Sequence, residues 1–283
     1  MNEHYFDNID TEEKAYWLGF LYADGYNIDL YRIGTHLALR EIDHVKLFAK
    51  CVEAPVERVH TKPPYKFKAM GRIINSSGSV TLNLNSKHMA ETANKKGLTP
   101  RKSLTLKFPT NDIVPVELMK HFIRGYFDGD GHIGKTTIKG IHRYRVIIVS
   151  SKDFCEGLSK FTNKELDINM TVWDKKKTNI YKNSIGGNRQ TKIFCDWMYK
   201  DASIYLHRKF VIYKELCEKI KKIDERLDNT YSKYNNISFD KSRGKWTASV
   251  RINKKTKLIG RYATEMDAYN AQIQFKLFNV YAS

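Results

Sequence analysis

The chain has 283 residues, of which 41% are hydrophobic, so we expect two or three folded domains and exclude wholesale disorder. Lys and Arg number 49 against 31 Asp and Glu, a formal net charge of +18. This excess indicates an acidic polymer as the partner, with nucleic acid first, although a merely soluble basic protein is the alternative. The apolar runs are too short for a membrane span, and the acidic first residues lack the apolar core of a signal peptide.

The four cysteines do not form a recognisable metal or disulfide pattern. They include no CxxC pair, and no group of histidines accompanies them. We therefore expect reduced cysteines in an intracellular protein, in cytoplasm or nucleoid, and the sequence leaves a phage, bacterial or organellar host open.

The first part of the chain predicts an α+β unit. It opens with a helix that carries the motif AYWLGFLYADGYNI at residues 15–28. Alternation of apolar and polar residues predicts strands after it, and apolar spacing of 3.6 residues predicts helices. The expected elements are a strand at 32–40, a helix at 41–53, strands at 56–62 and 79–85, and a helix at 86–97.

The motif recurs as HFIRGYFDGDGHIG at residues 121–134. The same kinds of elements follow it. They are a strand at 144–151, a helix at 152–165, strands at 170–176 and 179–185, and a helix at 189–201. A domain-sized repeat of this kind predicts two αββαββα units, each with an antiparallel sheet, at residues 1–110 and 111–226.

A long helix near Ser203–Arg226 is expected to close the second unit, with Asp201 or Ser203 as its N-cap. A polar stretch then leads into a small unit within residues 227–283, which holds ten Lys and Arg against four Asp and Glu. Its pattern predicts strands at 245–252 and 258–262. A cap formed by Thr264 and Asp267 predicts a helix that runs to about Leu277.

Glycines inside both motif helices call for an explanation, because a helical Gly costs about 1 kcal/mol relative to Ala. Gly19 and Ala23 lie on one face of the first helix, and Gly125 and Gly129 lie on one face of the second. Such a stripe packs either against the helix's own sheet or against another helix. Because the stripe is duplicated, we expect the two helices to pack on each other about a pseudo-twofold axis.

This packing would bring Asp24 and Asp130 together at the helix ends. Gly25 and Gly131 follow them, and we expect both to adopt the left-handed conformation that ends many helices. A single such aspartate would be an ordinary turn residue, but two at one register indicate a site for a hard divalent cation such as Mg²⁺. A cation beside basic antiparallel sheets suits hydrolysis of a phosphodiester, with the sheets in the major groove of DNA.

The segments WLGFLYADG (17–25) and IRGYFDGDG (123–131) resemble the paired motifs of the LAGLIDADG homing endonucleases in their single-chain form. The resemblance covers about residues 12–225. It implies a monomer whose two units form a saddle of antiparallel sheets. It also implies Mg²⁺-dependent cleavage, or cleavage with another divalent cation such as Mn²⁺, of both strands of a long, imperfectly palindromic DNA site. The break would be staggered.

The resemblance also assigns roles to residues. Asp24 and Asp130 match the metal-binding catalytic acids, and the carbonyl groups of Ala23 and Gly129 match those that help hold the metal. Tyr22 stands where the family has an earlier acidic residue.

The second motif keeps that earlier acid as Asp128, in a position that is generally structural. The family often adds a basic residue near each metal, for which Lys87 and Lys192 are candidates, unless they are plain solvated lysines. A binding protein that has lost cleavage, such as a maturase or regulator, and an RNA-binding module remain alternatives. The target site and the host element, whether intron, intein or free-standing gene, stay open.

The segments GKWTASVRI and LIGRYATEMDAYNAQIQF resemble the APETALA2-type DNA-binding domain over about residues 237–283. That family has a three-stranded sheet backed by one helix. Alternation puts one set of side chains toward the helix, namely Trp246, Ala248, Val250 and Ile252. It puts the other set outward, namely Lys245, Thr247, Ser249 and Arg251. Arg243, Ser249 and Arg251 match DNA-contacting positions, and the alternative is a small basic domain that binds RNA or protein.

Overall fold

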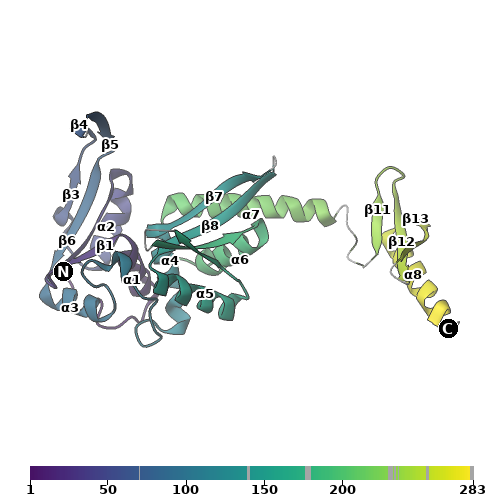
Figure 1. Ribbon diagram of the computed structural model, residues 1–283, viewed down its shortest axis with the longest axis horizontal. Coiled ribbons are helices and arrows are strands. Elements are labelled where there is room, and N and C mark those ends of the chain that lie inside the picture. The colour runs from purple at the N-terminus through teal and green to yellow at the C-terminus, as the bar shows by residue number, and fades with distance from the viewer. Residues whose placement is uncertain are drawn as a thin grey trace. The chain divides into compact units, whose positions relative to one another are not determined.

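The computed structural model describes residues 1–280 except 70, 139–140, 176–179, 229–231, 233, 235 and 253–254. The chain divides into two compact units, Met1–Leu216 and Cys217–Ser283 (Figure 1). The first unit contains both copies of the repeated motif. In the described part of the chain, no helix combines the length and apolarity that crossing a membrane would need. The four cysteines form no disulfide.

The first repeat forms a four-stranded antiparallel sheet with the strand order β1-β2-β6-β3. A short two-stranded hairpin, β4–β5, is inserted between β3 and β6 and projects beyond the sheet (Figure 1). The elements are α1 (Glu12–Asp24), β1 (Gly25–Ile28), β2 (Arg32–Ala38), α2 (Ile42–Cys51), β3 (Val59–Lys62), β4 (Tyr65–Ala69), β5 (Arg72–Ser76), β6 (Ser79–Asn85) and α3 (Lys87–Lys95).

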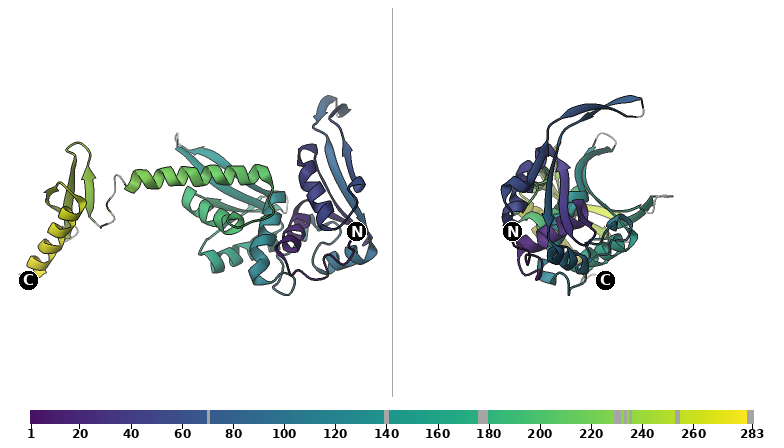
Figure 2. Two further views of the ribbon diagram at one scale, coloured as in Figure 1. Left: turned by 180° about the vertical axis from the view of Figure 1, so that it is seen from behind. Right: turned by 90° about the vertical axis from the view of Figure 1, so that its left-hand side faces the viewer.

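The second repeat has an equivalent sheet, with the order β7-β8-β10-β9. Helices α5 and α6 contact the strands of this sheet (Figure 2), as α2 and α3 contact those of the first. The elements are α4 (Met119–Asp130), β7 (Gly131–Ile138), β8 (Ile141–Ser150), α5 (Lys152–Leu166), β9 (Thr171–Lys175), β10 (Ile180–Gly186), α6 (Asn188–Tyr199) and α7 (His207–Asp228). Short 3-10 turns lie at Leu39–Glu41, Val56–Arg58, Lys102–Leu104 and Val116–Leu118. The predicted α+β architecture with duplicated antiparallel sheets is confirmed.

Local sequence explains where several of these elements begin. Ser86 caps α3 by accepting a hydrogen bond from the amide of Met89 at 3.2 Å. Ser151 caps α5 in the same way, with the amide of Phe154 at 3.2 Å. Each Ser follows a strand and opens an apolar helical pattern, so the same residue type satisfies an orphan donor after the last strand of the first repeat and after the second strand of the second repeat.

The predicted start of the long helix is wrong, because α7 begins at His207 and not near Ser203. The amide of Ser203 donates to a carboxylate oxygen of Glu12 at 2.8 Å, and the amide of Leu206 donates to Asp128 at 2.7 Å. These long-range bonds hold the preceding segment in place outside the helix. Neither Asp201 nor Ser203 is therefore the N-cap.

The glycine stripes form the contact between the two motif helices. A Cβ atom at Gly19 would lie 2.0 Å from the carbonyl oxygen of Phe122 on α4, and one at Gly125 would lie 1.9 Å from that of Tyr16 on α1. Both distances are far below van der Waals contact, so only glycine permits this approach. The prediction that the helices pack on each other, and not only on their own sheets, is confirmed.

The conformation expected for Gly25 and Gly131 is wrong. Their φ angles are −90° and −83°, so both are extended and begin strands β1 and β7 directly. Glycine is required there by lack of space: a Cβ atom would lie 2.5 Å from the carbonyl oxygen of Leu21 or Phe127. The first residue of each strand thus packs directly against the last turn of the helix that precedes it.

The second compact unit contains a three-stranded antiparallel sheet, ordered β11-β12-β13, and a helix. Its elements are β11 (Ile237–Asp240), β12 (Lys245–Ile252), β13 (Lys255–Tyr262) and α8 (Glu265–Val280). A small core of Ile237, Ala248 and Ala268 joins sheet to helix. The predicted cap of α8 is confirmed, because Thr264 accepts from the amide of Asp267 at 3.1 Å.

Candidate functional site

Two aspartates meet where helices α1 and α4 end. A Cβ atom at Gly129 would lie 2.4 Å from the Cβ atom of Ala23 and 3.4 Å from Oδ2 of Asp24. Asp130 is the next residue along the chain, so the close approach of the helices brings its carboxylate to that of Asp24. The sequence predicted this convergence from the glycine stripes.

Proximity and burial make both carboxylates reluctant to ionise. Burial raises the pKa of Asp24 above its ordinary value. Asp130 is open to solvent on one side, yet burial of its carboxyl group and then the charge of Asp24 raise its pKa to about 6. Two anions in one place therefore form a site that a cation would stabilise.

Two lysines that the sequence analysis did not single out lie beside these aspartates. Nζ of Lys102 donates to the carbonyl oxygen of Ala23 at 2.8 Å. Nζ of Lys209 donates to the carbonyl oxygens of Asp128 at 2.8 Å and Gly129 at 3.3 Å, and further to those of Phe127 and Gly131. Each lysine therefore caps the C-terminus of one motif helix.

Both lysines are almost completely buried, at 9% and 2% exposure. Burial lowers the pKa of Lys102, against the charges of Asp130 and Asp24, which favour the ammonium form. Burial also lowers the pKa of Lys209, to about 8, against the nearby aspartates. Their signal in the sequence is a repeated Arg-Lys pair: Arg101 precedes Lys102 as Arg208 precedes Lys209, at nearly the spacing of the motifs.

The lysines proposed from the sequence lie in other surroundings. Lys87, at the start of α3, is 74% exposed and pairs with Glu91 at 3.8 Å. Lys192 on α6 pairs with Asp196 at 2.5 Å. The buried helix caps Lys102 and Lys209 lie beside Asp24 and Asp130 instead, because the chain that enters and leaves the second repeat passes the helix ends.

Asp128 has a different environment from the other two aspartates. It is fully buried, and its carboxylate accepts from the hydroxyls of Tyr16 at 2.8 Å and Tyr199 at 2.6 Å, and from the amide of Leu206 at 2.7 Å. Leu206 lies three residues before Lys209, so this carboxylate fixes the segment that carries the lysine. In the first repeat, the hydroxyl of Tyr22 bonds to the carbonyl oxygen of Lys96 instead.

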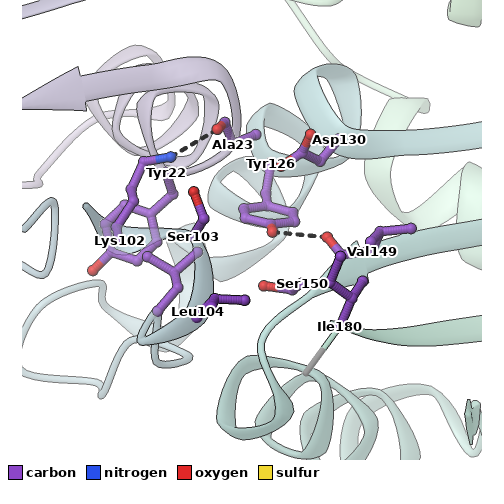
Figure 3. Close-up of a pocket in the computed structure, with 11 residues that line it drawn as sticks. Tyr22, Ala23, Lys102, Ser103, Leu104, Tyr126, Asp130, Val149, Ser150 and Ile180 are labelled. Carbon is purple, nitrogen blue, oxygen red and sulfur yellow. Dashed lines mark hydrogen bonds between the residues drawn. The ribbon is translucent and has the colours of Figure 1, made fainter. Parts of the chain in front are cut away.

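A pocket of about 190 Å³ opens beside this centre (Figure 3). Asp130 and Tyr126 line it from α4, and Ala23 and Lys102 line it from the other repeat. The hydroxyl of Tyr126 donates to the carbonyl oxygen of Val149 at 3.0 Å, which ties α4 to strand β8. Polar groups of both repeats thus face one hollow.

The residues present fit a hard divalent cation. Carboxylate oxygens of Asp24 and Asp130 are the ligands that Mg²⁺ prefers, and burial raises the pKa values of both groups although Lys102 and Lys209 lie nearby. The carbonyl oxygens of Ala23 and Gly129 already accept from lysines, but each has a second lone pair. The four oxygens that the sequence nominated are therefore all compatible with a metal.

The sheet faces opposite the buried core are polar and basic. In the first sheet, His36 bonds to Thr81 at 2.7 Å and Tyr26 bonds to Asn83 at 2.6 Å. In the second sheet, strand pairing puts one exposed set of side chains on one face: Arg143, Arg145, Lys182 and Trp173. Such a set offers both hydrogen-bond donors and an aromatic surface.

The predicted contact residues of the second compact unit are placed as follows. Lys245 begins β12 and is exposed, and Arg243 lies in the preceding turn, where it pairs with Asp240 at 3.1 Å. Ser249 lies on β12, and its hydroxyl donates to the carbonyl oxygen of Asn236 at 3.0 Å. The side chain of Arg251 lies outside the described residues.

The inward face of that sheet follows the predicted alternation. Ala248 and Val250 are buried, and Trp246 packs against the small core. The side chain of Ile252 lies outside the described residues. Arg261 on β13 is exposed and pairs across from Thr247, so it adds a positive charge to the outward face.

Comparisons with known proteins give one family match. Residues 117–197 match the LAGLIDADG-like domain family. The chain is 30% identical over 157 residues to the probable translation initiation factor IF-2 of Methanocaldococcus jannaschii, a match that covers 53% of this chain but only 13% of that protein.

Solved structures are similar at lower identity. The homing endonuclease I-WcaI bound to its DNA recognition sequence is 14% identical, with a TM-score of 0.47, over 69% of this chain and 85% of that chain. The meganuclease I-SmaMI bound to uncleavable DNA is 9% identical, with a TM-score of 0.47, over 75% of this chain and 90% of that chain. Residues 117–197 are therefore similar to the LAGLIDADG-like domain family, and Asp130, at the end of the first helix in this range, is one of the two aspartates of the candidate site.

Proposed function

We propose that this protein is a single-chain, two-repeat LAGLIDADG endonuclease that makes a staggered break in a specific, imperfectly palindromic DNA duplex with Mg²⁺ or a similar divalent cation. The observation that carries the proposal is the meeting of Asp24 and Asp130 at the foot of a glycine-packed helix pair. The family match over the second repeat and the equivalent sheet of the first repeat support it. A pseudo-dimer of this kind acts as a monomer.

The chain's own groups have distinct roles in the proposed reaction. Asp24 and Asp130 hold the cation, which when bound supplies Lewis acidity at the scissile phosphate. Lys102 and Lys209 counter the charge of the aspartates and fix the carbonyl groups of the helix ends. Because these lysines are buried, we assign them a positioning role instead of a direct contact with phosphate.

The polar sheet faces are proposed to recognise DNA. An exposed Arg such as Arg143 or Arg145 can donate a forked pair of bonds to guanine in the major groove, and Lys182 can contact phosphate. The two sheets, one on each repeat, would each read one half of the site. The repeats differ in sequence, which suits a target whose halves are not identical.

The second compact unit is proposed to be an APETALA2-type accessory domain that binds DNA through its sheet. Its three antiparallel strands and the helix α8 that packs on them support this assignment, as do the exposed positive charges of Arg243, Lys245 and Arg261. Tethering a second binding surface raises the effective concentration at an adjacent sequence, so it would add affinity without altering the catalytic centre.

A binding protein without cleavage is the second candidate function. The buried network of Asp128 is equally compatible with this function, because its hydrogen bonds stabilise the fold whether or not the site is active. Retention of both Asp24 and Asp130 favours the nuclease. We further propose that the protein works in a reducing, intracellular compartment, consistent with four cysteines that form no disulfide.

The experiment is a selection of bound and cleaved sites from a random DNA library, with Mg²⁺ and with a chelator. We expect staggered double-strand breaks only with the metal, and loss of cleavage with retained binding in the variants Asp24→Asn and Asp130→Asn. The exposed Asp112 provides a matched control, and Asp112→Asn should cut normally. Binding of DNA without any cleavage by the unaltered protein would support the second candidate, and preference for structured RNA competitor would reject the endonuclease and leave an RNA-binding protein, such as a maturase.

A further inference from the structure

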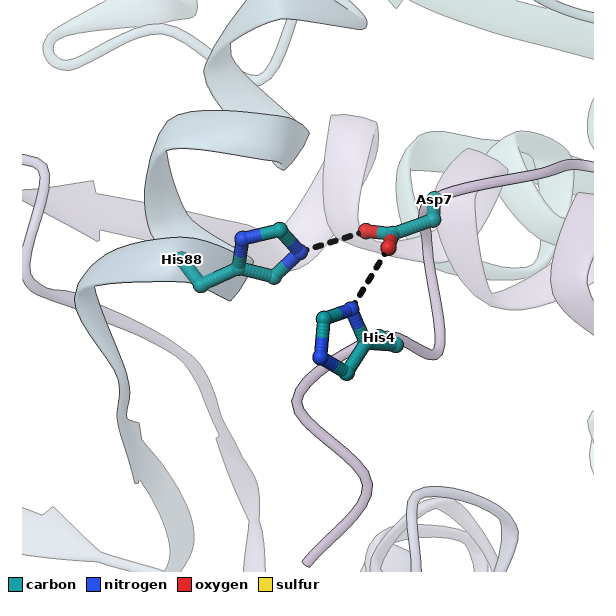
Figure 4. Close-up of side chains that lie close together, drawn as sticks. All are labelled: His4, Asp7 and His88. Carbon is teal, nitrogen blue, oxygen red and sulfur yellow. Dashed lines mark hydrogen bonds and ion pairs between the residues drawn. The ribbon is translucent and has the colours of Figure 1, made fainter.

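A second group of possible metal ligands lies outside the aspartate centre. His4 and Asp7 belong to the segment before α1, and His88 belongs to the first turn of α3 (Figure 4). Nδ1 of His4 lies 2.7 Å from one carboxylate oxygen of Asp7, and Nε2 of His88 lies 2.7 Å from the other. The three possible ligand atoms all lie within 4.8 Å of one another.

The spacing is close to what a tetrahedral ion needs. With bonds of about 2.0–2.1 Å, as for Zn²⁺, two ligands of a tetrahedral ion are about 3.3 Å apart. The side chains of His4, Asp7 and His88 are 73%, 35% and 45% exposed, so small rotations can open the present 2.7 Å contacts. The same exposure leaves room for water to complete the coordination.

The chemistry of the donors separates this group from the aspartate centre. Two imidazoles and one carboxylate suit Zn²⁺ and similar transition metals, whereas oxygen-only sites suit Mg²⁺. The rings of His4 and His88 are close, with centroids 4.4 Å apart and planes at 51°. Each ring turns one nitrogen toward the same carboxylate (Figure 4), which is the convergence that a shared ion requires.

We propose that His4, Asp7 and His88 form a surface site for a transition metal ion of the Zn²⁺ class that fastens the N-terminal segment to α3. That segment is already docked: the amide of Asn2 donates to the carbonyl oxygen of Val52 at 2.9 Å, and Phe6 is completely buried. It continues directly into α1, whose other end carries the first aspartate of the catalytic centre. A bound ion would therefore stiffen the support of α1 without entering that centre.

The site is tested in full-length protein that carries Asp24→Asn and Asp130→Asn, so that the aspartate centre does not contribute. We expect Zn²⁺ to raise the melting temperature, because a ligand that binds only the folded state stabilises it. Co²⁺ should bind at one ion per chain and give the visible absorption bands of an ion with few, unlike ligands. The charge-transfer band of a thiolate ligand should be absent. Mg²⁺ should have neither effect.

The variants His88→Ala and Asp7→Asn should abolish both signals, and His60→Ala should retain them as the matched control for an exposed histidine. A cooperative melting transition in the absence of metal shows that a variant is folded. The effect of the metal is then the difference between the melting temperatures of the same variant with and without it. The proposal is overturned if the unaltered ligand set binds no Zn²⁺ or Co²⁺, or if His88→Ala binds them equally well. Neither result bears on DNA cleavage, which is tested separately.

Discussion

The carbonyl oxygen of Tyr16 on α1 fills the position that a side chain at Gly125 on α4 would need. An ideal Cβ atom at Gly125 would lie 1.9 Å from that oxygen, and the reciprocal contact between Gly19 and Phe122 is equally close at 2.0 Å. The helix pair therefore owes its geometry to two missing side chains. The position of the aspartates follows from this contact, since each stands five residues beyond a contact glycine.

Gly125→Ala is expected to push the helices apart. Overpacking of a buried contact typically destabilises a protein by about 1–3 kcal/mol, and a clash with backbone leaves little room to relax. We expect a lower melting temperature and, in any protein that folds, weaker metal-dependent cleavage. Gly186→Ala is the matched control, because a Cβ atom there would meet nothing within 4 Å. Equal stability of the two variants would contradict the packing argument.

Cleavage is expected to fall on the acid side of about pH 6 when the metal is limiting. The carboxylate of Asp130 must be ionised to bind the cation, and its pKa is raised to about 6 in the metal-free protein. Since metal and protons compete for the same oxygens, more Mg²⁺ should move this acid limb to lower pH. Rate profiles at several Mg²⁺ concentrations would measure the shift, and an acid limb independent of Mg²⁺ would count against Asp130 as a ligand.

The same pKa predicts a change in the stability of the metal-free protein. The folded state holds a proton on Asp130 more tightly than the unfolded chain, whose carboxyl has its ordinary value of 3.8. The free energy of unfolding therefore decreases as pH rises from about 4 to about 6, and that loss persists above it. Asp130→Asn should remove this loss, so its melting temperature without metal should exceed that of the unaltered protein at neutral pH. The difference should shrink as pH is lowered through this range.

Lys209→Met and Lys102→Met are expected to move the acid limb of cleavage to higher pH. Both lysines favour the ionised form of Asp24 and Asp130, so their removal raises the pKa of the aspartates further. A lysine with only a structural role would lower stability without moving the pH profile. Lys87→Met, which changes an exposed lysine on α3, should leave the profile unchanged. If Lys87→Met moved the pH profile and the other two variants did not, Lys87 would be the basic residue that acts on the aspartates.

Asp128→Asn is expected to destabilise the fold strongly. The amide oxygen of Asn can still accept from Tyr16 and Leu206, but its NH₂ group cannot accept from the hydroxyl of Tyr199. The substitution also removes the carboxylate charge near Lys209. Loss of one partner of a buried charged group typically costs about 3–5 kcal/mol. Denaturant unfolding would measure the loss, with the exposed Asp112→Asn as control. A change below about 1 kcal/mol would contradict the assigned network.

Removal of positive charge from the sheet of the second compact unit is expected to weaken DNA binding and its salt dependence. Each lost phosphate contact lowers the slope of log affinity against log salt by about 0.9. The double variant Arg243→Ala/Lys245→Ala tests this on the outward face. Lys276→Ala removes one charge from α8, where the lysine bonds to Gln272 at 3.2 Å, and should have little effect. Identical salt slopes for all proteins would remove this face from the DNA-binding surface.

The repeated pattern of residues was sufficient to predict many of the secondary-structure elements and the contact between the two motif helices. Strands at 79–85 and 245–252 coincide with β6 and β12, because alternating burial leaves a period of two in the sequence. The β4–β5 hairpin was not predicted. Its strands are exposed and bury neither face, so they lack the regular alternation of apolar and polar residues that reveals a strand in the sequence. The glycines at equivalent positions of both motif helices predicted that the helices contact each other. Glycine is unfavourable inside a helix, and close approach of the two backbones explains why both helices have it at the same position.

Only the tertiary structure showed which lysines lie beside Asp24 and Asp130 and which conformation ends the two motif helices. Lys102 and Lys209 come from segments without a periodic pattern, and they reach the helix ends only because the chain folds past them. Gly25 and Gly131 proved extended because each strand starts against the last turn of its helix, a packing constraint absent from local turn preferences. The sequence thus determines the repeated motifs and elements, and even shows the Arg-Lys pair twice, whereas the contacts that this pair makes with distant segments depend on the folded path.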